Sequence, residues 1–267
     1  MPSGTPDYES FYQAFESPLM RQIRREAYGE EIGQHSWTDA DELRGDIARL
    51  GLSTSSRVID LGCGPCGPLT FVAMTAGCRV TGVDVSRSAL RVGRARAAAL
   101  GVGGLLSVAQ VDLNRLLPFQ SESFDAAISF DVVLHVPDRL RLFREVARLL
   151  RPGGRFIFTD AGVLTGAISN EDVRRRSVHG ESYFVPPGWN DRLLGEAGLH
   201  LIETEDRTAR VLRNAGGRLT AMLAHRAELE RQSGAGEVER YLLYLETVLT
   251  ISRSRVLSRL MYAAEIH

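Results

Sequence analysis

A short apolar stretch that leads directly into three glycines constrains this chain more than any other feature. Val58-Ile59-Asp60-Leu61 has the length and composition of a buried parallel strand. Gly62, Gly64 and Gly67 follow at the spacing G-x-G-x-x-G, and the third is where close packing of helix on strand needs a glycine. A strand, a glycine turn and a helix N-terminus together favour a nucleotide-sized ligand, because glycine lets backbone N–H groups approach it. The spacing alone leaves the ligand open.

Around this turn, strand and helix patterns alternate along the chain. Strands are predicted at residues 58–61, 79–83, 105–111, 124–130, 155–159, 199–205 and 257–266. Helices are predicted at about residues 8–14, 18–28, 38–50, 67–76, 86–100, 139–150, 190–197, 213–231 and 237–253. Helices between strands imply crossover connections, so we expect an α/β fold with a doubly wound, mainly parallel sheet.

The N-terminal segment carries two local signals. Aromatic residues recur at helical spacing, at Tyr8, Phe11, Tyr12 and Phe15. Such a stripe either packs in the core or forms a lid over a substrate. Thr38-x-x-Asp41 has the form of a capping box and predicts that Thr38 begins the next helix.

At 267 residues the chain is long enough for one α/β domain with additions. We expect a Rossmann-like core at residues 51–163, preceded by a helical N-terminal lid at residues 1–50. Residues 164–267 would supply a cap segment, the remaining strands and a helical insertion before the last strand. That insertion serves either the substrate or a homodimer contact.

Composition excludes several classes of protein. All 32 basic residues are arginine, which removes Schiff-base lysine enzymes and phosphate-loop NTPases and indicates a GC-rich genome. The net charge of -1 gives no field for nucleic acid, and no apolar stretch or signal-peptide pattern predicts a membrane span or export. We therefore expect a cytoplasmic protein that binds neither nucleic acid nor membrane. Cys63, Cys66 and Cys78 form no even disulfide set and no second ligand pair, so no metal is expected.

Two carboxylates at strand ends, Asp60 and Asp84, help to identify the adenosine-containing cofactor that the glycine turn holds. Asp84 ends the second strand, where an acidic residue grips a ribose diol. NAD and S-adenosylmethionine both carry that diol, so Asp84 does not discriminate between them. Asp60 lies two positions before Gly62, where a carboxylate would repel a pyrophosphate and suit an ammonium or a sulfonium. These residues favour S-adenosylmethionine, with an NAD-dependent oxidoreductase as the alternative.

Five motifs in a fixed order add a resemblance. Asp60-x-Gly62-x-Gly64, Asp84, Asp112, the strand at 124–130 and the turn Arg151-Pro152-Gly153-Gly154 follow one another between residues 57 and 160. In this order the chain resembles the class I S-adenosylmethionine-dependent methyltransferases of small molecules. The resemblance implies a seven-stranded sheet whose last strand, at 257–266, runs antiparallel near the edge.

The resemblance also implies cofactor-binding positions. Asp84 would hold the ribose hydroxyls, Asp112 would accept from the adenine amino group, and Ser36 would close over the methionine end. The full implied set is Ser36, Asp60, Gly62, Cys63, Gly64, Asp84, Val85, Val111, Asp112, Leu113 and Phe130. The cofactor would therefore be S-adenosyl-L-methionine.

The segment from Ser129 to His135 is similar to the corresponding motif of phosphoethanolamine methyltransferases and related enzymes. By that similarity Asp131 contacts the substrate and His135 pairs with a lid tyrosine. Tyr12 falls where these enzymes place an N-terminal tyrosine that closes, with Ser36, over the methionine end. His135 is also the best candidate for a general base, because its pKa can lie near the working pH; otherwise it is a packing histidine. Glu181 is a weaker candidate, able to stabilise positive charge if an aromatic carbon is methylated.

Aromatic residues around the expected cap favour a small, partly apolar acceptor that is methylated on oxygen, nitrogen or carbon. We expect this chemistry to belong to bacterial secondary metabolism. The alternative to a partly apolar acceptor is a phosphobase or amine metabolite. Residues 178–183 offer no counterpart to the phosphate-holding residues of the phosphobase enzymes, which counts against a phosphobase. Arg174-Arg175-Arg176 could hold an anion, but a run of charges on a helix is expected to be a solvated face. A non-catalytic adenosyl-binding protein is a further hypothesis.

Overall fold

The computed structural model describes residues 12, 14–177 and 180–267. Most of the aromatic helix predicted at 8–14 therefore lies outside the described residues. The strands are β1 (Arg57–Leu61), β2 (Arg79–Asp84), β3 (Leu106–Gln110), β4 (Phe124–Phe130), β5 (Leu150–Leu164), β6 (Leu199–Asp206) and β7 (Leu257–Ile266). The helices are α2 (Pro18–Tyr28), α3 (Ala40–Leu50), α4 (Gly67–Ala76), α5 (Arg87–Ala99), η1 (Val133–His135), α6 (Arg139–Leu149), α7 (Asn170–Arg176), α8 (Trp189–Glu196), α9 (Thr208–Ala224), α10 (Arg226–Ser233) and α11 (Ala235–Arg253).

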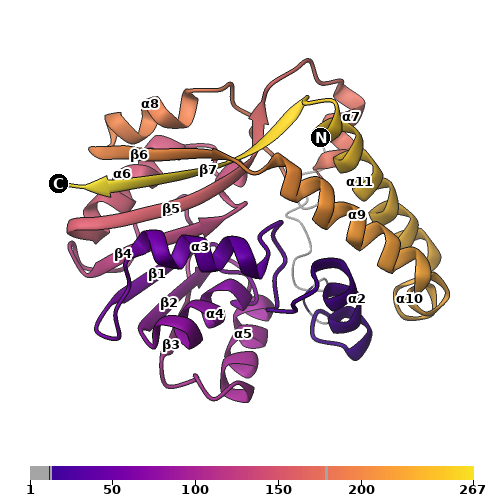
Figure 1. Ribbon diagram of the computed structural model, residues 1–267, viewed down its shortest axis with the longest axis horizontal. Coiled ribbons are helices and arrows are strands. Elements are labelled where there is room, and N and C mark those ends of the chain that lie inside the picture. Colours follow the sequence, from indigo (N-terminus) through magenta and orange to yellow (C-terminus); the bar gives the residue numbers. More distant parts are fainter. Residues whose placement is uncertain (1–11, 13, 178–179) are drawn as a thin grey trace.

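The strands form one seven-stranded sheet in the order β3-β2-β1-β4-β5-β7-β6 (Figure 1). β1 to β5 pair in parallel, whereas β7 runs antiparallel to both β5 and β6. The predicted α/β fold and its antiparallel last strand are confirmed. Because β1, β2 and β4 are parallel, their carboxyl ends meet at one edge of the sheet, where a ligand site is expected.

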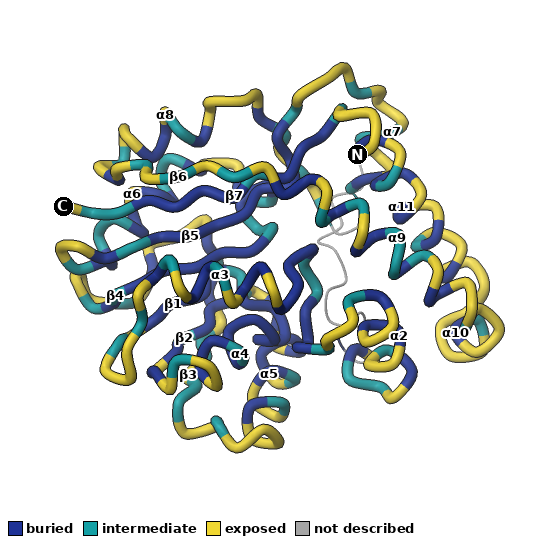
Figure 2. Tube along the Cα trace, in the orientation of Figure 1, coloured by how far each residue is buried: buried dark blue, intermediate teal, exposed yellow. Residues whose placement is uncertain are grey.

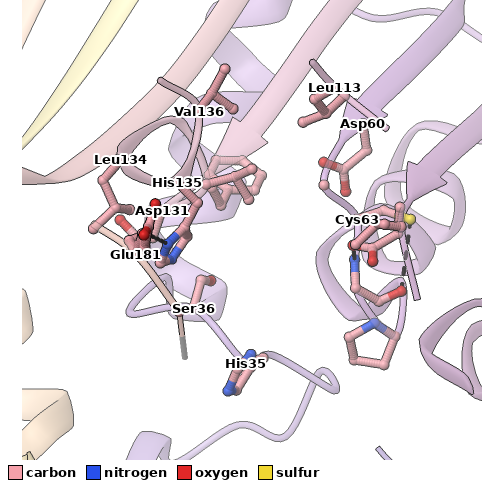
Figure 3. Close-up of a pocket in the computed structure, with 18 of the residues that line it drawn as sticks. His35, Ser36, Asp60, Cys63, Leu113, Asp131, Leu134, His135, Val136 and Glu181 are labelled. Carbon is pink, nitrogen blue, oxygen red and sulfur yellow. Dashed lines mark hydrogen bonds between the residues drawn. The ribbon is translucent and has the colours of Figure 1, made fainter. Parts of the chain in front are cut away.

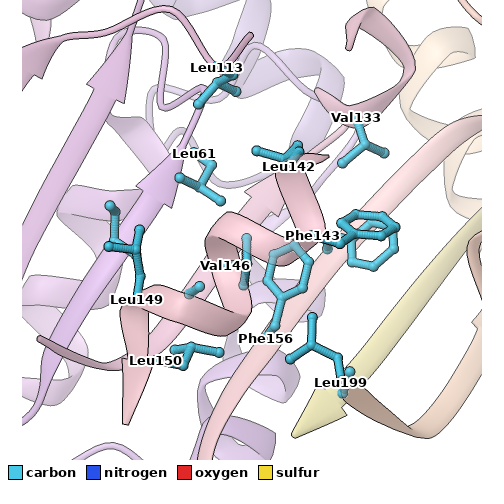
Figure 4. Packing of buried hydrophobic residues seen from close by; sticks show 14 of the residues in the cluster. Leu61, Leu113, Val133, Leu142, Phe143, Val146, Leu149, Leu150, Phe156 and Leu199 are labelled. Carbon is cyan, nitrogen blue, oxygen red and sulfur yellow. The ribbon is translucent and has the colours of Figure 1, made fainter. Parts of the chain in front are cut away.

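Helices cover both faces of the sheet. The cluster on one face draws side chains from α3, α4 and α5, among them Leu43, Leu69 and Leu90. The opposite cluster is built from α6 and α8 against the strands, with Phe143 of α6 next to Phe156 of β5 (Figure 4). α3 therefore belongs to a sheet-covering layer, although it lies within the segment predicted as a lid.

A third group of helices lies beyond the carboxyl ends of the strands. α2 packs against α9, and α9 packs against α11, so these elements stand apart from the sheet (Figure 1). Their inward sides are buried, while α10 is largely exposed (Figure 2). The helix predicted at 213–231 is wrong in its bounds, because the chain leaves the helix at His225 and starts α10 there.

Two sequence predictions about local structure need correction. Asp39, not Thr38, caps α3, because its carboxylate accepts from the Glu42 N–H at 2.9 Å, while the Thr38 hydroxyl accepts from Arg259. A glycine is needed at position 67 because the loop that contains Gly33 approaches it closely, and not because a helix packs on a strand there. A Cβ at this position would lie 2.1 Å from the carbonyl oxygen of Gly33.

The boundary predicted between residues 163 and 164 falls at the last residue of β5, and β6 and β7 of the same sheet come later in the chain. The three-part division stays a prediction. Among the described residues, no helix combines the length and the apolar character that crossing a membrane requires.

Candidate active site

A cavity of about 690 Å³ opens where the carboxyl ends of β1, β2 and β4 face α9 and α11. This volume lies in the range of sites for cofactors and small ligands. All the site residues predicted from the sequence line it: Tyr12, Ser36, Asp60, Gly62, Cys63, Gly64, Asp84, Val85, Val111, Asp112, Leu113, Phe130, Asp131, His135 and Glu181. In Figure 3, Asp60 and Cys63 lie on one side of the cavity, and Asp131, His135 and Glu181 lie on the other.

The glycine turn is held close to its neighbours. Gly62 has a φ of 79°, and a Cβ there would lie 2.5 Å from the side chain of Val132. The Tyr12 hydroxyl lies 3.3 Å from where a Cβ of Gly64 would be. Larger residues at these two positions would strain the backbone and fill the space between the turn and Tyr12.

The two carboxylates beside the turn are in different environments. Asp84 accepts from the backbone N–H groups of Gly64 at 2.8 Å and Ser86 at 2.9 Å, so it is fixed at the end of β2. Asp60 is only 2% exposed, lines the cavity and has no hydrogen-bonding or ion-pair partner among the described residues. Burial, with a smaller contribution from the charge of Asp84, raises the pKa of Asp60 well above its ordinary value. A buried carboxylate without a cation is costly, and a ligand cation here would remove that cost.

Apolar side chains continue the cavity wall at the ends of β2 and β3. Val85 is 52% exposed although it follows a buried strand, and Val111 and Leu113 present apolar atoms to the same cavity. Asp112 lies between them, with one carboxylate oxygen accepting from Asn114. An apolar slot beside a carboxylate suits a flat ring that carries an amino group.

The two cysteines of the turn pack against each other. Their sulfur atoms are 3.5 Å apart, both are buried, and no disulfide joins them. Burial is the main reason that the pKa of Cys63 is well above its ordinary value, so the thiol stays protonated. Gly82 and Gly93 make room for the two sulfur atoms, since a Cβ at either would approach within 2.7 Å. Among the described residues, no group of three or more His, Cys, Asp and Glu could hold a metal ion.

On the other side of the cavity, Asp131 is the centre of a buried network. Its carboxylate accepts from Arg259 Nε at 2.8 Å, from the Thr159 hydroxyl at 2.9 Å and from the Trp37 N–H at 2.8 Å. Asp131 therefore holds the loop that carries Ser36 and Trp37 against the sheet. Its direct contact with a substrate stays a prediction.

His135 lies at the end of η1 with its Nδ1 2.9 Å from the carbonyl oxygen of Glu181. Burial lowers the pKa of His135 from its ordinary value of 6.5, and the charge of Arg176 acts in the same direction. The Tyr12 hydroxyl lies 3.3 Å from His35 Nδ1. The implied pairing of His135 with a lid tyrosine stays a prediction. The Glu181 carboxylate accepts from the Tyr183 hydroxyl at 2.6 Å.

Two arginines outside the predicted set of site residues also line the cavity, Arg176 and Arg218. The expected solvated face holds for Arg174 and Arg175, which pair with Glu171 on exposed surface. It is wrong for Arg176, which is 7% exposed and turns inward against Tyr244. No short motif marks either position; only the buried environment distinguishes them.

A sheet of this order, with a glycine turn after β1 and a carboxylate near the ends of β1, β2 and β3, defines a protein that binds an adenosine-containing cofactor beside a second ligand. Known proteins narrow that class. Residues 59–158 match the family model described as a methyltransferase domain. The methyltransferase GfsG of Streptomyces halstedii is 37% identical over 132 residues, which are 49% of this chain and 46% of that protein.

The ubiquinone biosynthesis O-methyltransferase of Alkalilimnicola ehrlichii is 31% identical over 173 residues, which are 61% of this chain and 69% of the relative. A structure of phosphoethanolamine N-methyltransferase 2 from Haemonchus contortus superposes with a TM-score of 0.82 at 20% identity, over 98% of this chain and 60% of that one. The chain belongs to the class I S-adenosylmethionine-dependent methyltransferases. It spans less than half the length of GfsG.

Proposed function

We propose that this protein transfers the methyl group of S-adenosylmethionine to a small, partly apolar acceptor. The observation that carries the proposal is Asp60, a buried carboxylate without a partner among the described residues, which lines the cavity beside the glycine turn. S-adenosylmethionine is the cofactor of the family and supplies a methyl group on a sulfonium, ready for displacement by a nucleophile. The ammonium or the sulfonium of S-adenosylmethionine would supply the positively charged partner that Asp60 lacks among the described residues.

In this proposal the cofactor side of the cavity binds and orients. Asp84, already fixed by two backbone N–H groups, would hold the ribose hydroxyls. Val85, Val111 and Leu113 would pack on the adenine, and Asp112 would accept from its amino group. Tyr12 and Ser36 would close over the methionine end, which excludes water from the reacting atoms.

His135 is our candidate for the base. The Glu181 carbonyl can only accept a hydrogen bond, so it fixes the ring proton on Nδ1 and leaves Nε2 as the unprotonated nitrogen. Its lowered pKa keeps the ring neutral at physiological pH. For a hydroxyl acceptor, Nε2 would take the proton as the oxygen attacks, a contribution of about 10²–10⁴-fold in rate. An amine acceptor needs only to be neutral.

The acceptor side of the cavity supports a partly apolar substrate, since it is lined by Trp37, Leu134, Tyr183 and Tyr244. We further propose that the substrate belongs to bacterial secondary metabolism; the similarity to a methyltransferase of Streptomyces halstedii supports the bacterial part of this proposal. A homodimer contact through the helical insertion at residues 213–253 stays a prediction.

Turnover tests the proposal. The protein is incubated with S-adenosylmethionine and a panel of phenols, amines, carboxylic acids and electron-rich arenes, and release of S-adenosylhomocysteine is measured. We expect turnover with at least one acceptor and a large loss in His135→Gln if that acceptor is a hydroxyl. Binding of S-adenosylhomocysteine without turnover across the panel would instead favour a non-catalytic adenosyl-binding protein.

A further inference from the structure

Arg176 and Arg218 place two buried positive charges on the acceptor side of the cavity. Arg176 is the last residue of α7, and Arg218 lies on α9. Both are 7% exposed and both line the cavity. Within the described part of the chain, neither guanidinium has a carboxylate within 4.0 Å. Buried arginines are normally paired, so this arrangement needs an explanation.

The two arginines differ in how many of their donors are used. Arg218 donates to the carbonyl oxygen of His35 at 2.7 Å and lies between the rings of Tyr28 and Trp37. It is thus held in place and contributes mainly its charge. Arg176 has a single hydrogen-bond partner among the described residues, the Tyr244 hydroxyl at the long distance of 3.4 Å. Most of its five N–H donors are therefore available to a molecule in the cavity.

The acids that share this side of the cavity already have partners. Asp131 is paired with Arg259, which in turn binds Glu42. The carboxylate of Glu181 accepts from Tyr183. Among the described residues, the charges on this side that lack an oppositely charged partner are therefore positive, at Arg176 and Arg218. On the described part of the cofactor side, the group without a partner is the Asp60 carboxyl.

We propose that Arg176, beside the Tyr244 hydroxyl and in the field of Arg218, binds an oxyanion of the methyl acceptor. The substrate is then a small acid, a carboxylate or a phosphate ester, whose apolar body packs on Tyr244 and Trp37. Arginine suits this task because its planar fork matches both oxyanions. The inference deepens the function proposed above and rests on it.

Calorimetry on the cofactor-loaded protein tests this assignment without knowledge of the natural acceptor. The protein is saturated with S-adenosylhomocysteine and titrated with benzoate, phenyl phosphate and the neutral benzamide. Arg176→Gln is compared with Arg175→Gln, a matched control, because Arg175 is the adjacent arginine and pairs with Glu171 on the surface. We expect wild type and Arg175→Gln to bind one of the two acids, and to bind benzamide at least about tenfold more weakly. Arg176→Gln should lose about tenfold or more in acid affinity, with little change for benzamide.

The outcomes separate this inference from the function on which it rests. Absence of S-adenosylhomocysteine binding overturns both. Cofactor binding with no acid preference in wild type, or equal acid affinity in the two glutamine variants, overturns the anion site alone. Preference for benzoate over phenyl phosphate assigns a carboxylate, and the reverse assigns a phosphate ester. Arg176→Lys provides a second variant that keeps the charge; it should retain part of the affinity.

Discussion

Replacing Arg259 by methionine should lower the stability of the fold more than the same replacement of a surface arginine. Arg259 is 1% exposed on β7 and binds Glu42 at 2.9 Å, Asp131 at 2.8 Å and Thr38 at 2.7 Å. Methionine fills a similar volume but leaves two buried carboxylates without this cation. Breaking a buried pair from one side costs about 3–5 kcal/mol. We expect the lower end, about 3 kcal/mol, because Arg207 remains 4.0 Å from Glu42.

Thermal unfolding measures this effect. A loss of about 3 kcal/mol corresponds to a fall in Tm of roughly 6–12 °C for a chain of this size. The loss should also depend on pH. Burial already raises the pKa of Glu42 against the charges of Arg259 and Arg207, and removing Arg259 raises it further. A carboxyl whose folded pKa exceeds its unfolded pKa destabilises the protein at high pH, and the cost fades as the pH falls through the folded pKa.

The matched control is Arg192→Met, since Arg192 pairs with Glu196 on the exposed surface of α8. Its cost should stay below about 1 kcal/mol and should show little dependence on pH between 5 and 8. Two results would contradict this prediction: Arg259→Met costs no more stability than Arg192→Met, or the stability lost in Arg259→Met is as large at pH 5 as at pH 8.

Three further predictions follow from the site and the turn. Asp84→Ala should weaken S-adenosylhomocysteine binding by about a hundredfold in calorimetry, because it removes the carboxylate that we propose accepts two hydrogen bonds from the ribose hydroxyls. Unchanged affinity would exclude this role of Asp84. His135→Gln should abolish the acidic limb of the pH–rate profile, which in wild type should lie below 6.5 because burial lowers that pKa; an unaltered profile would exclude His135 as the base. Gly67→Ala should destabilise the protein by several kcal/mol in denaturant unfolding, because its Cβ would lie 2.1 Å from the carbonyl oxygen of Gly33. The control is Gly195→Ala in α8, where a Cβ meets nothing within 4 Å. This control should be neutral or stabilising by up to about 1 kcal/mol. Equal effects of these two alanines would contradict the close approach at Gly67.

Much of the fold and the cofactor side of the site could be predicted from the sequence. Strands such as β1 and β7 are marked by apolar stretches, and parallel pairing then brings Asp60, Asp84 and Asp112 to one edge of the sheet. These residues are close in space because each follows a strand. Sequence spacing therefore carries their geometry.

The acceptor side could not be predicted in the same way. Arg176 differs from Arg174 and Arg175 only by the side of α7 on which it lies, and α7 meets the cavity through its packing on α11, far along the chain. The cap at Asp39 was missed for a similar reason. Thr38 has the right local chemistry, but its hydroxyl is used by Arg259, 221 residues away. Such competition between local and tertiary partners leaves no mark in a short window of sequence.

Calorimetric titration of the wild-type protein with S-adenosylhomocysteine and with NADH decides which adenosine-containing cofactor the cavity binds. The cavity combines a glycine turn with the buried Asp60, which has no partner within the described part of the chain. It should therefore accept a ligand that carries an ammonium and reject one that carries a pyrophosphate. The predicted result is one-to-one binding of S-adenosylhomocysteine, weakened in Asp60→Asn, with no binding of NADH. Tight binding of NADH, or S-adenosylhomocysteine affinity that Asp60→Asn leaves unchanged, would contradict the assignment of this cavity.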